Sequence, residues 1–145
     1  MYYTVLADVN GQDEGPDERS RWKYSRDKAD TVHLLLQHGA DVTLQDDTHS
    51  TPLHLASSKG SVETVYLLLQ HGANVNAQNG DQSTPLHLAA SSHLLLEGTI
   101  VRLLLKHGAN LDIKDNKGRT PLEIATLAGN SWIEKLLSDF LTKRG

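Results

Sequence analysis

Residues 51–78 read TPLHLASSKGSVETVYLLLQHGANVNAQ, and this stretch decides the fold. Thr51 is a favourable helix N-cap, and Pro52 suits the first helical position because its missing N–H would have no partner there. Gly60 interrupts this helix, and apolar residues at helical spacing then predict a second helix from about Ser61 to His71. The residues that follow are rich in Asn, Gln and Gly, which is turn chemistry. The stretch therefore predicts two short helices joined by a tight turn, followed by a polar loop.

Two short strings recur along the chain with matching offsets. His-Gly-Ala begins at His38, His71 and His107, and Thr-Pro-Leu begins at Thr51, Thr84 and Thr120. Both sets are 33 and then 36 residues apart. Because two unrelated strings keep the same offsets, one structural unit has been repeated. A period in the low thirties is typical of a solenoid, in which each unit buries its apolar face against its neighbours.

The unit resembles the ankyrin repeat, as TPLHLAASS from Thr84 and VRLLLKHGANLDIKDNKGRTPLEIA from Val101 also show. The resemblance implies an all-α solenoid of stacked antiparallel helix pairs with hairpin loops. We expect first helices to begin near Thr51, Thr84 and Thr120, and loops at 39–50, 72–83 and 108–119. A β-strand longer than about four residues within a helical segment would contradict this fold.

The repeat register divides residues 1–145, taken as one domain, into five parts. These are a half repeat and loop at 1–17, a degenerate repeat at 18–50 with a normal second helix at 31–38, a repeat at 51–83, a repeat with a three-residue insertion at 84–119, and a C-terminal capping repeat at 120–145. Glu134 and Ser138 replace apolar residues of the preceding repeat, as an uncovered terminal face requires. The chain begins inside a repeat, so a non-catalytic fragment of a larger protein is one interpretation.

Composition and charge narrow the function classes. The absence of cysteine excludes disulfides and thiol catalysis. The start of the chain lacks secretory-signal features and no apolar run is long enough for a membrane span, so we expect an intracellular protein, cytoplasmic or nuclear. The net charge of −4 is graded, with −5 in residues 1–50, −2 in 51–97 and +3 in 98–145. This gradient is too weak to indicate nucleic acid, and neither nucleic acid nor membrane is expected as a partner.

Most of the eight histidines have structural explanations. His54 and His87 stand where the ring bonds locally and across to the neighbouring loop, and the His-Gly-Ala histidines close the second helices. We therefore expect no metal and no cofactor. His49 beside Asp47 is raw material for general-base catalysis, which leaves an enzyme or small-ligand binder using the concave groove as the alternative. No nucleophile, phosphate loop or paired-carboxylate motif accompanies them, so no catalytic residue is assigned and the sequence favours a protein that is not an enzyme.

The insertion falls in the stretch from Ser92 to Gly98 and lengthens the first helix or the turn after it. It contains three consecutive leucines, Leu94, Leu95 and Leu96. They either form an exposed partner-binding knob or fold back over the second helix, and burial is favoured because exposed leucines reduce solubility. We expect a monomer unless these leucines or the N-terminal face self-associate.

The resemblance implies a protein–protein interaction module or scaffold, because in ankyrin proteins the partner usually lies along the hairpin tips and the inner faces of the first helices. Trp22 and Tyr24 have two interpretations, as exposed binding residues or, for Trp22, as a core residue that replaces a leucine. Carried over by position, the expected partner-binding residues are Trp22, Tyr24, Gln45, Asp47, Thr48, His49, Ser50, Leu55, Gln78, Asp81, Gln82, Leu88, Lys114, Asn116, Lys117 and Arg119.

Overall fold

A computed structural model of the chain describes residues 27–94 and 97–144, which form seven helices and no strand. The all-α expectation is therefore confirmed, and Trp22 and Tyr24 lie outside the described residues. The helices are α3 (Asp27–Gln37), α4 (Pro52–Lys59), α5 (Val62–Gln70), α6 (Pro85–Ser91), α7 (Glu97–Lys106), α8 (Pro121–Leu127) and α9 (Ser131–Arg144).

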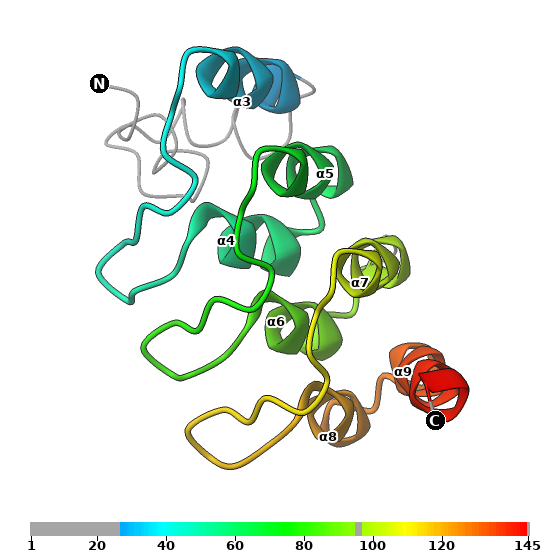
Figure 1. Ribbon diagram of the computed structural model, residues 1–145. Helices are drawn as coiled ribbons and strands as arrows, with labels where there is room; N and C mark the ends of the chain where they lie inside the picture. Colours follow the sequence, from blue (N-terminus) through cyan, green and yellow to red (C-terminus); the bar gives the residue numbers. More distant parts are fainter. Residues whose placement is uncertain (1–26, 95–96, 145) are drawn as a thin grey trace.

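The helices stack in two layers (Figure 1). In the inner layer, α4 packs on α6 and α6 packs on α8. In the outer layer, α3, α5, α7 and α9 pack on one another in that order. Three hairpins, at 39–50, 72–83 and 108–119, connect each outer helix to the next inner helix and project together from one side (Figure 1). This is the solenoid of helix pairs that the repeat predicts.

The inner helices begin where the Thr-Pro-Leu strings place them. Thr51, Thr84 and Thr120 are N-caps with extended backbone, and each side chain accepts a hydrogen bond from the N–H three residues later. The side chain of that third residue accepts a hydrogen bond from the backbone N–H of the cap, which completes a capping box. Each cap stabilises its helix by about 1 kcal/mol.

One apolar core runs between the two layers. Leu53, Leu68 and Leu104 are fully buried in it, and Ile133 and Leu137 continue it to the last repeat. Alanines at equivalent positions of the inner helices let these helices approach one another closely; they are Ala56, Ala89 and Ala125, each at most 1% exposed.

The insertion lengthens the turn between α6 and α7, not the first helix. Ser92 leaves the helix in an extended conformation, and α7 spans Glu97–Lys106. The expectation that the leucines are buried is wrong for Leu94, which is 50% exposed. The extended turn carries this side chain outward, and only part of it lies against the Gly60 turn, where a Cβ on Gly60 would be 3.1 Å from its Cδ1. Leu95 and Leu96 lie outside the described residues.

Two outer helices differ in length from the expectation. α3 is already helical at Asp27, earlier than the predicted start at Thr31, and its added turn buries Ala29. α9 continues to Arg144, beyond the register position at which the other outer helices end. The continuation has a local cause: Phe140-Leu141-Thr142 stands in the register of His107-Gly108-Ala109, so no glycine supplies the left-handed residue that ends the other outer helices.

Candidate functional site

Each hairpin is closed by one short polar side chain. The Oδ1 atom of Asp46 accepts the N–H groups of Thr48 and Ser50 at 2.8 and 3.0 Å. Asn79 and Asp115 make the same pair of bonds to residues two and four positions later. The turn is therefore held from within, and the side chains between these bonds are left to face solvent.

The fourth residue of each tight turn has left-handed backbone. The φ angles are 62° at His49, 61° at Gln82 and 76° at Gly118. A residue with a Cβ is strained there by about 1 kcal/mol. His49 and Gln82 thus hold their side chains at the hairpin tips at a cost in folding free energy, which is a pattern found at binding sites.

Backbone hydrogen bonds join the three hairpin tips into one ribbon. The N–H of Gly80 donates to Thr48 O at 2.8 Å, and the N–H of Asn116 donates to Asp81 O at 2.9 Å. A Cβ on Gly80 would lie 3.0 Å from Thr48 O, so glycine permits this close approach. The tips therefore present their side chains at fixed spacing.

Two inner helices, α4 and α6, are each connected to the following hairpin by one buried histidine. His54 Nδ1 accepts the N–H of Thr51 at 3.1 Å, and its Nε2 donates to Ser83 O at 2.8 Å. His87 repeats this arrangement with Thr84 and with Arg119 O at 2.9 Å. Burial lowers the pKa of both rings, which keeps them neutral. The local and cross-repeat bonds expected of these histidines are confirmed.

The last hairpin carries a partly buried ion pair. Arg119 Nε and Nη2 lie 3.0 and 2.8 Å from Asp115 Oδ2. Burial raises the pKa of Asp115, but the Arg119 side chain and two backbone N–H groups outweigh it and bring the pKa to about 2. The pair fixes Arg119, whose side chain remains 34% exposed, at the edge of the inner layer.

A hollow of about 320 Å³ lies between α6, α8 and the third hairpin. Leu88, Ile124 and Leu127 supply its apolar part, and Arg119 lies at its edge. Leu127 is 71% exposed and was missed in the sequence. The signal was present, because Ser58, Ser91 and Leu127 share one register position on the inner helices.

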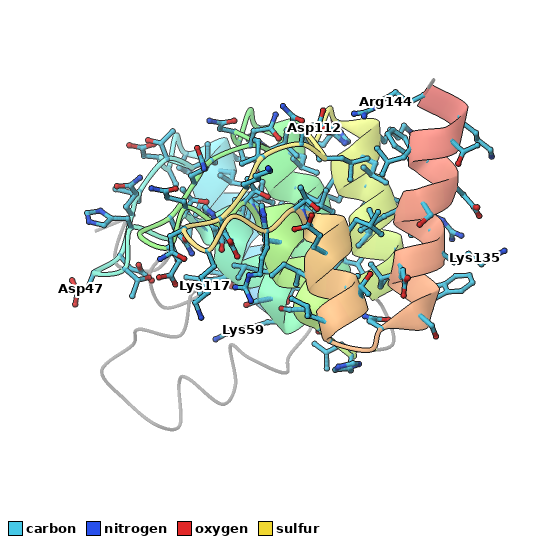
Figure 2. All side chains as sticks on the ribbon, turned by 90° about the horizontal axis from the view of Figure 1, so that it is seen from below. Asp47, Lys59, Asp112, Lys117, Lys135 and Arg144 are labelled. Atoms are coloured by element: carbon cyan, nitrogen blue, oxygen red, sulfur yellow. The ribbon has the colours of Figure 1, made fainter. Side chains whose placement is uncertain are left out.

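Most of the sequence-predicted residues in the described part of the chain are exposed, and Figure 2 shows Asp47 and Lys117 on the hairpin side, opposite Lys135. Leu55, Leu88 and Arg119 are partly buried. Ser50 is a correction: it is only 4% exposed, because its hydroxyl lies under the next hairpin and contacts Asn79 Nδ2 at 3.3 Å. The exposed ones are Gln45, Asp47, Thr48, His49, Gln78, Asp81, Gln82, Lys114, Asn116 and Lys117.

The Asp47–His49 pair remains an untested catalytic hypothesis. Both residues are exposed, and in the described part of the chain no hydrogen bond joins their side chains. The His49 ring lies beside Gly80, with Cδ2 3.6 Å from the position of a Cβ there. Over residues 27–94 and 97–144 no group of three potential metal ligands converges, and no helix combines the length and hydropathy needed to span a membrane.

Glu97 was also missed, and it lies away from the hairpins at the start of α7. It is 1% exposed, and neither carboxyl oxygen has a hydrogen-bond partner among the described residues. Burial raises the pKa of Glu97 to about 7, and the nearby Ser92 hydroxyl, outside hydrogen-bonding geometry, lowers it only in part. A buried carboxylate without a partner destabilises the fold when it is ionised.

Comparison with known proteins agrees with this geometry. A family model described as ankyrin repeats (3 copies) matches residues 23–97 and 80–143, which together span most of the chain. A comparison with curated proteins finds no match. The repeated capping boxes, the histidine bridges between repeats and this match together show that the chain belongs to the ankyrin-repeat family.

Proposed function

We propose that this chain is a protein-binding module whose partner lies along the hairpin tips and in the hollow between α6 and α8. Ankyrin repeats are generally protein–protein interaction modules, and this is the starting point of the proposal. A fold does not by itself define a site, so the assignment to this surface depends on the residues found there.

The observation that carries the proposal is the position of Leu127. It is a large apolar side chain with 71% exposure, and it lies beside Leu88 and Ile124 in a hollow of about 320 Å³. Exposed apolar surface rimmed by polar residues is a sign of an interaction site, and arginine is enriched among the residues that dominate binding energy. Arg119 supplies that arginine, held by Asp115.

The polar tips define the rest of the partner's chemistry. Asp47 and Asp81 give the first two tips negative charge, and Lys117 gives the third a positive charge. A partner should therefore place an apolar side chain in the hollow, an acidic group near Lys117 and basic groups near the two aspartates. Such charge complementarity affects orientation and association rate more than affinity.

The test is capture of partners from an extract of the source cells on the immobilised chain, read by quantitative mass spectrometry. Leu127→Asp places a charge in the hollow, and Leu34→Asp is the matched control because Leu34 is 55% exposed on α3 of the outer layer. We expect proteins retained by the wild type to be lost with Leu127→Asp and kept with Leu34→Asp. Equal retention by both variants would refute the proposed surface.

A further inference from the structure

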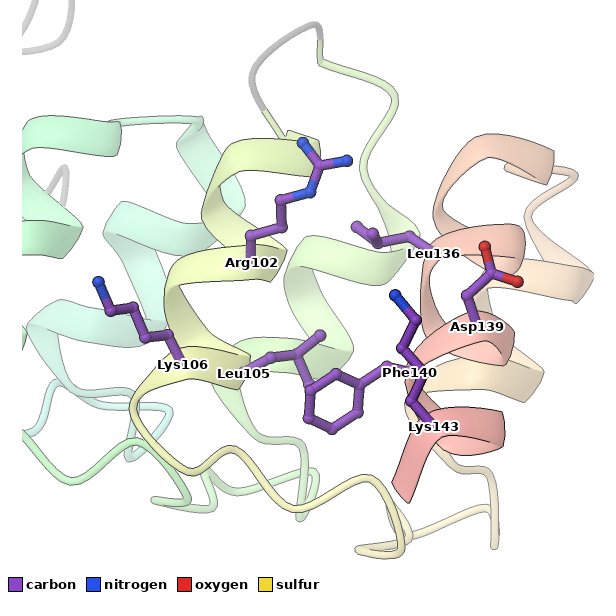
Figure 3. Close-up of a pocket in the computed structure, with 7 residues that line it drawn as sticks. All are labelled: Arg102, Leu105, Lys106, Leu136, Asp139, Phe140 and Lys143. Atoms are coloured by element: carbon purple, nitrogen blue, oxygen red, sulfur yellow. The ribbon is translucent and has the colours of Figure 1, made fainter. Parts of the chain in front are cut away.

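A groove lies between the outer helices of the last two repeats, α7 and α9, and it depends on the greater length of α9. α9 extends to Arg144 because Leu141 stands where the other repeats have the glycine of His-Gly-Ala, and Phe140 replaces the histidine. The added turns place Phe140 and Lys143 alongside the end of α7 (Figure 3). This groove of about 410 Å³ lies between these two helices, in the outer layer and away from the hairpin tips.

The floor of this outer groove is apolar. Leu105 from α7 and Leu136 and Phe140 from α9 line it, and Figure 3 shows the Leu105 and Phe140 side chains pointing toward one another. Phe140 is 38% exposed, so part of the floor is open to solvent. The groove can therefore take up apolar side chains without a change in the core.

The rim of the outer groove is mainly cationic. Arg102, Lys106 and Lys143 line it against one acid, Asp139. Lys106 and Lys143 have no ion-pair or hydrogen-bond partner among the residues that the structure describes. Arg102 lies 5.7 Å from the centre of the Trp132 ring, which is 57% exposed. Unpaired cations around an apolar floor match a ligand that has both carboxylates and apolar side chains.

Trp132 of α9 extends this surface beyond the outer groove. Its indole lies over Gly98, where a Cβ would come within 2.6 Å of Nε1, so the ring rests directly on the backbone of α7. The guanidinium of Arg102 lies over the same ring. Tryptophan and arginine are enriched among the residues that dominate binding energy in protein interfaces, and phenylalanine is enriched in interfaces relative to the rest of the surface.

We propose that the outer groove binds an acidic amphipathic helix of a partner protein, separately from the hairpin surface. The apolar face of that helix lies on Leu105, Leu136 and Phe140, and its carboxylates face Arg102, Lys106 and Lys143. Charge complementarity selects an acidic segment, and the recessed apolar floor between two helices selects an apolar stripe at helical spacing.

The probe is a fluorescently labelled helical peptide in which glutamates surround leucines at i, i+3, i+4 and i+7, titrated with the full chain at low salt and read by anisotropy. Two control peptides carry lysine in place of glutamate or serine in place of leucine. We expect saturable binding of the probe and no binding of either control peptide. Absence of saturable binding of the probe would overturn the proposal, as would equal binding of the serine peptide.

Charge reversals locate the binding. Lys106→Glu and Lys143→Glu should each weaken binding by about three- to tenfold, because an attraction becomes a repulsion. Lys135→Glu is the matched control, since it makes the same charge change on α9 outside the groove, and it should stay within about twofold. Asp139→Asn should strengthen binding, because it removes the one acid on the rim.

The remaining outcomes separate this proposal from its alternatives. Phe140→Ala should abolish most of the binding while the thermal unfolding curve, followed by circular dichroism, shows a folded protein. If Lys135→Glu weakens binding as much as Lys106→Glu, the attraction is general and the groove is not the site. Phosphatidylserine vesicles bound with the same dependence on Lys106, Lys143 and Phe140, in preference to the peptide, would overturn the proposal in favour of a membrane surface.

Discussion

Replacement of Glu97 tests how much a buried carboxyl group without a hydrogen-bond partner destabilises this fold. The side chain is 1% exposed at the start of α7, and its carboxyl oxygens have no partner among the described residues. Burial raises its pKa from 4.5 to about 7. Glu97→Gln removes the ionisation and keeps the shape, and Glu97→Met also removes the polar group. We expect both variants to be more stable than the wild type at alkaline pH.

The magnitude follows from the pKa shift. Because the folded state binds the proton more tightly than the unfolded chain, ionisation is unfavourable to folding above pH 7 and has no effect below pH 4.5. A shift from 4.5 to about 7 corresponds to about 3 kcal/mol, at roughly 1.4 kcal/mol per unit. The stability of the wild type should therefore fall by about this amount, on account of Glu97, as the pH rises from 4.5 to above 7.

The assay is urea unfolding of the wild type and both variants across this pH range. At pH 8 the variants should gain about 2–3 kcal/mol over the wild type. The gain of Glu97→Gln should disappear near pH 4.5, and the gain of Glu97→Met should shrink there by the same amount. Glu63→Gln is the control, because Glu63 is an exposed acid in the first turn of α5. A gain that does not change with pH, or no gain at pH 8, would refute the account of Glu97 as an unpaired buried acid.

Three further predictions concern the hairpins. His87→Ala should lower the free energy of unfolding by about 1–3 kcal/mol in a urea titration, because it leaves the N–H of Thr84 and Arg119 O without their partner. In the Glu97→Gln background the stability should fall as the pH drops below 6.5, since burial lowers the pKa of His87 and the unfolded chain then binds more protons; a flat profile would contradict this. Asp115→Asn should keep both hydrogen bonds to the backbone of its hairpin, because Asn79 makes the same bonds in the preceding hairpin, and it should lose the ion pair with Arg119. It should therefore lower the free energy of unfolding by about 1–2 kcal/mol at neutral pH. That cost should disappear as the pH falls from 3.8 toward about 2, and its persistence there would show that the ion pair is not its source. His49→Gly should raise the free energy of unfolding by about 0.5 kcal/mol and Gly118→Ala should lower it by about 1 kcal/mol in a urea titration, because both positions have positive φ. Effects of the same sign would contradict the argument that a Cβ is strained at these positions.

The features that the sequence predicted are those specified by local, repeated chemistry. The threonine caps and the helix boundaries at Thr51, Thr84 and Thr120 depend on residues within one turn of one another. The bridges from His54 and His87 cross between repeats, but they were predictable because each repeat presents the same carbonyl in the same register.

The features that it did not predict depend on neighbours outside the local pattern. Ser50 is covered by the following hairpin, which no local rule places over it. Glu97 stands where the register has Ser61 and Asn130, both good helix-capping residues, but Glu97 already belongs to α7 and its side chain is buried. Leu127 was missed because the other two repeats have serine at its register position, so the repeat pattern predicts no apolar side chain there.

The two proposed surfaces should respond differently to salt. The outer groove has three cations and one acid on its rim, so its attraction to an acidic helix is mainly between exposed charges and should weaken as salt rises. The hollow depends on Leu88, Ile124 and Leu127, and its arginine is already paired with Asp115, so added salt removes little there. The core between the two surfaces, which includes Ala125 and Ile133, is fully packed, so a substitution on one side should leave the other unchanged. A partner released by salt and by Lys106→Glu therefore occupies the groove, and one that resists salt but is lost with Leu127→Asp occupies the hollow.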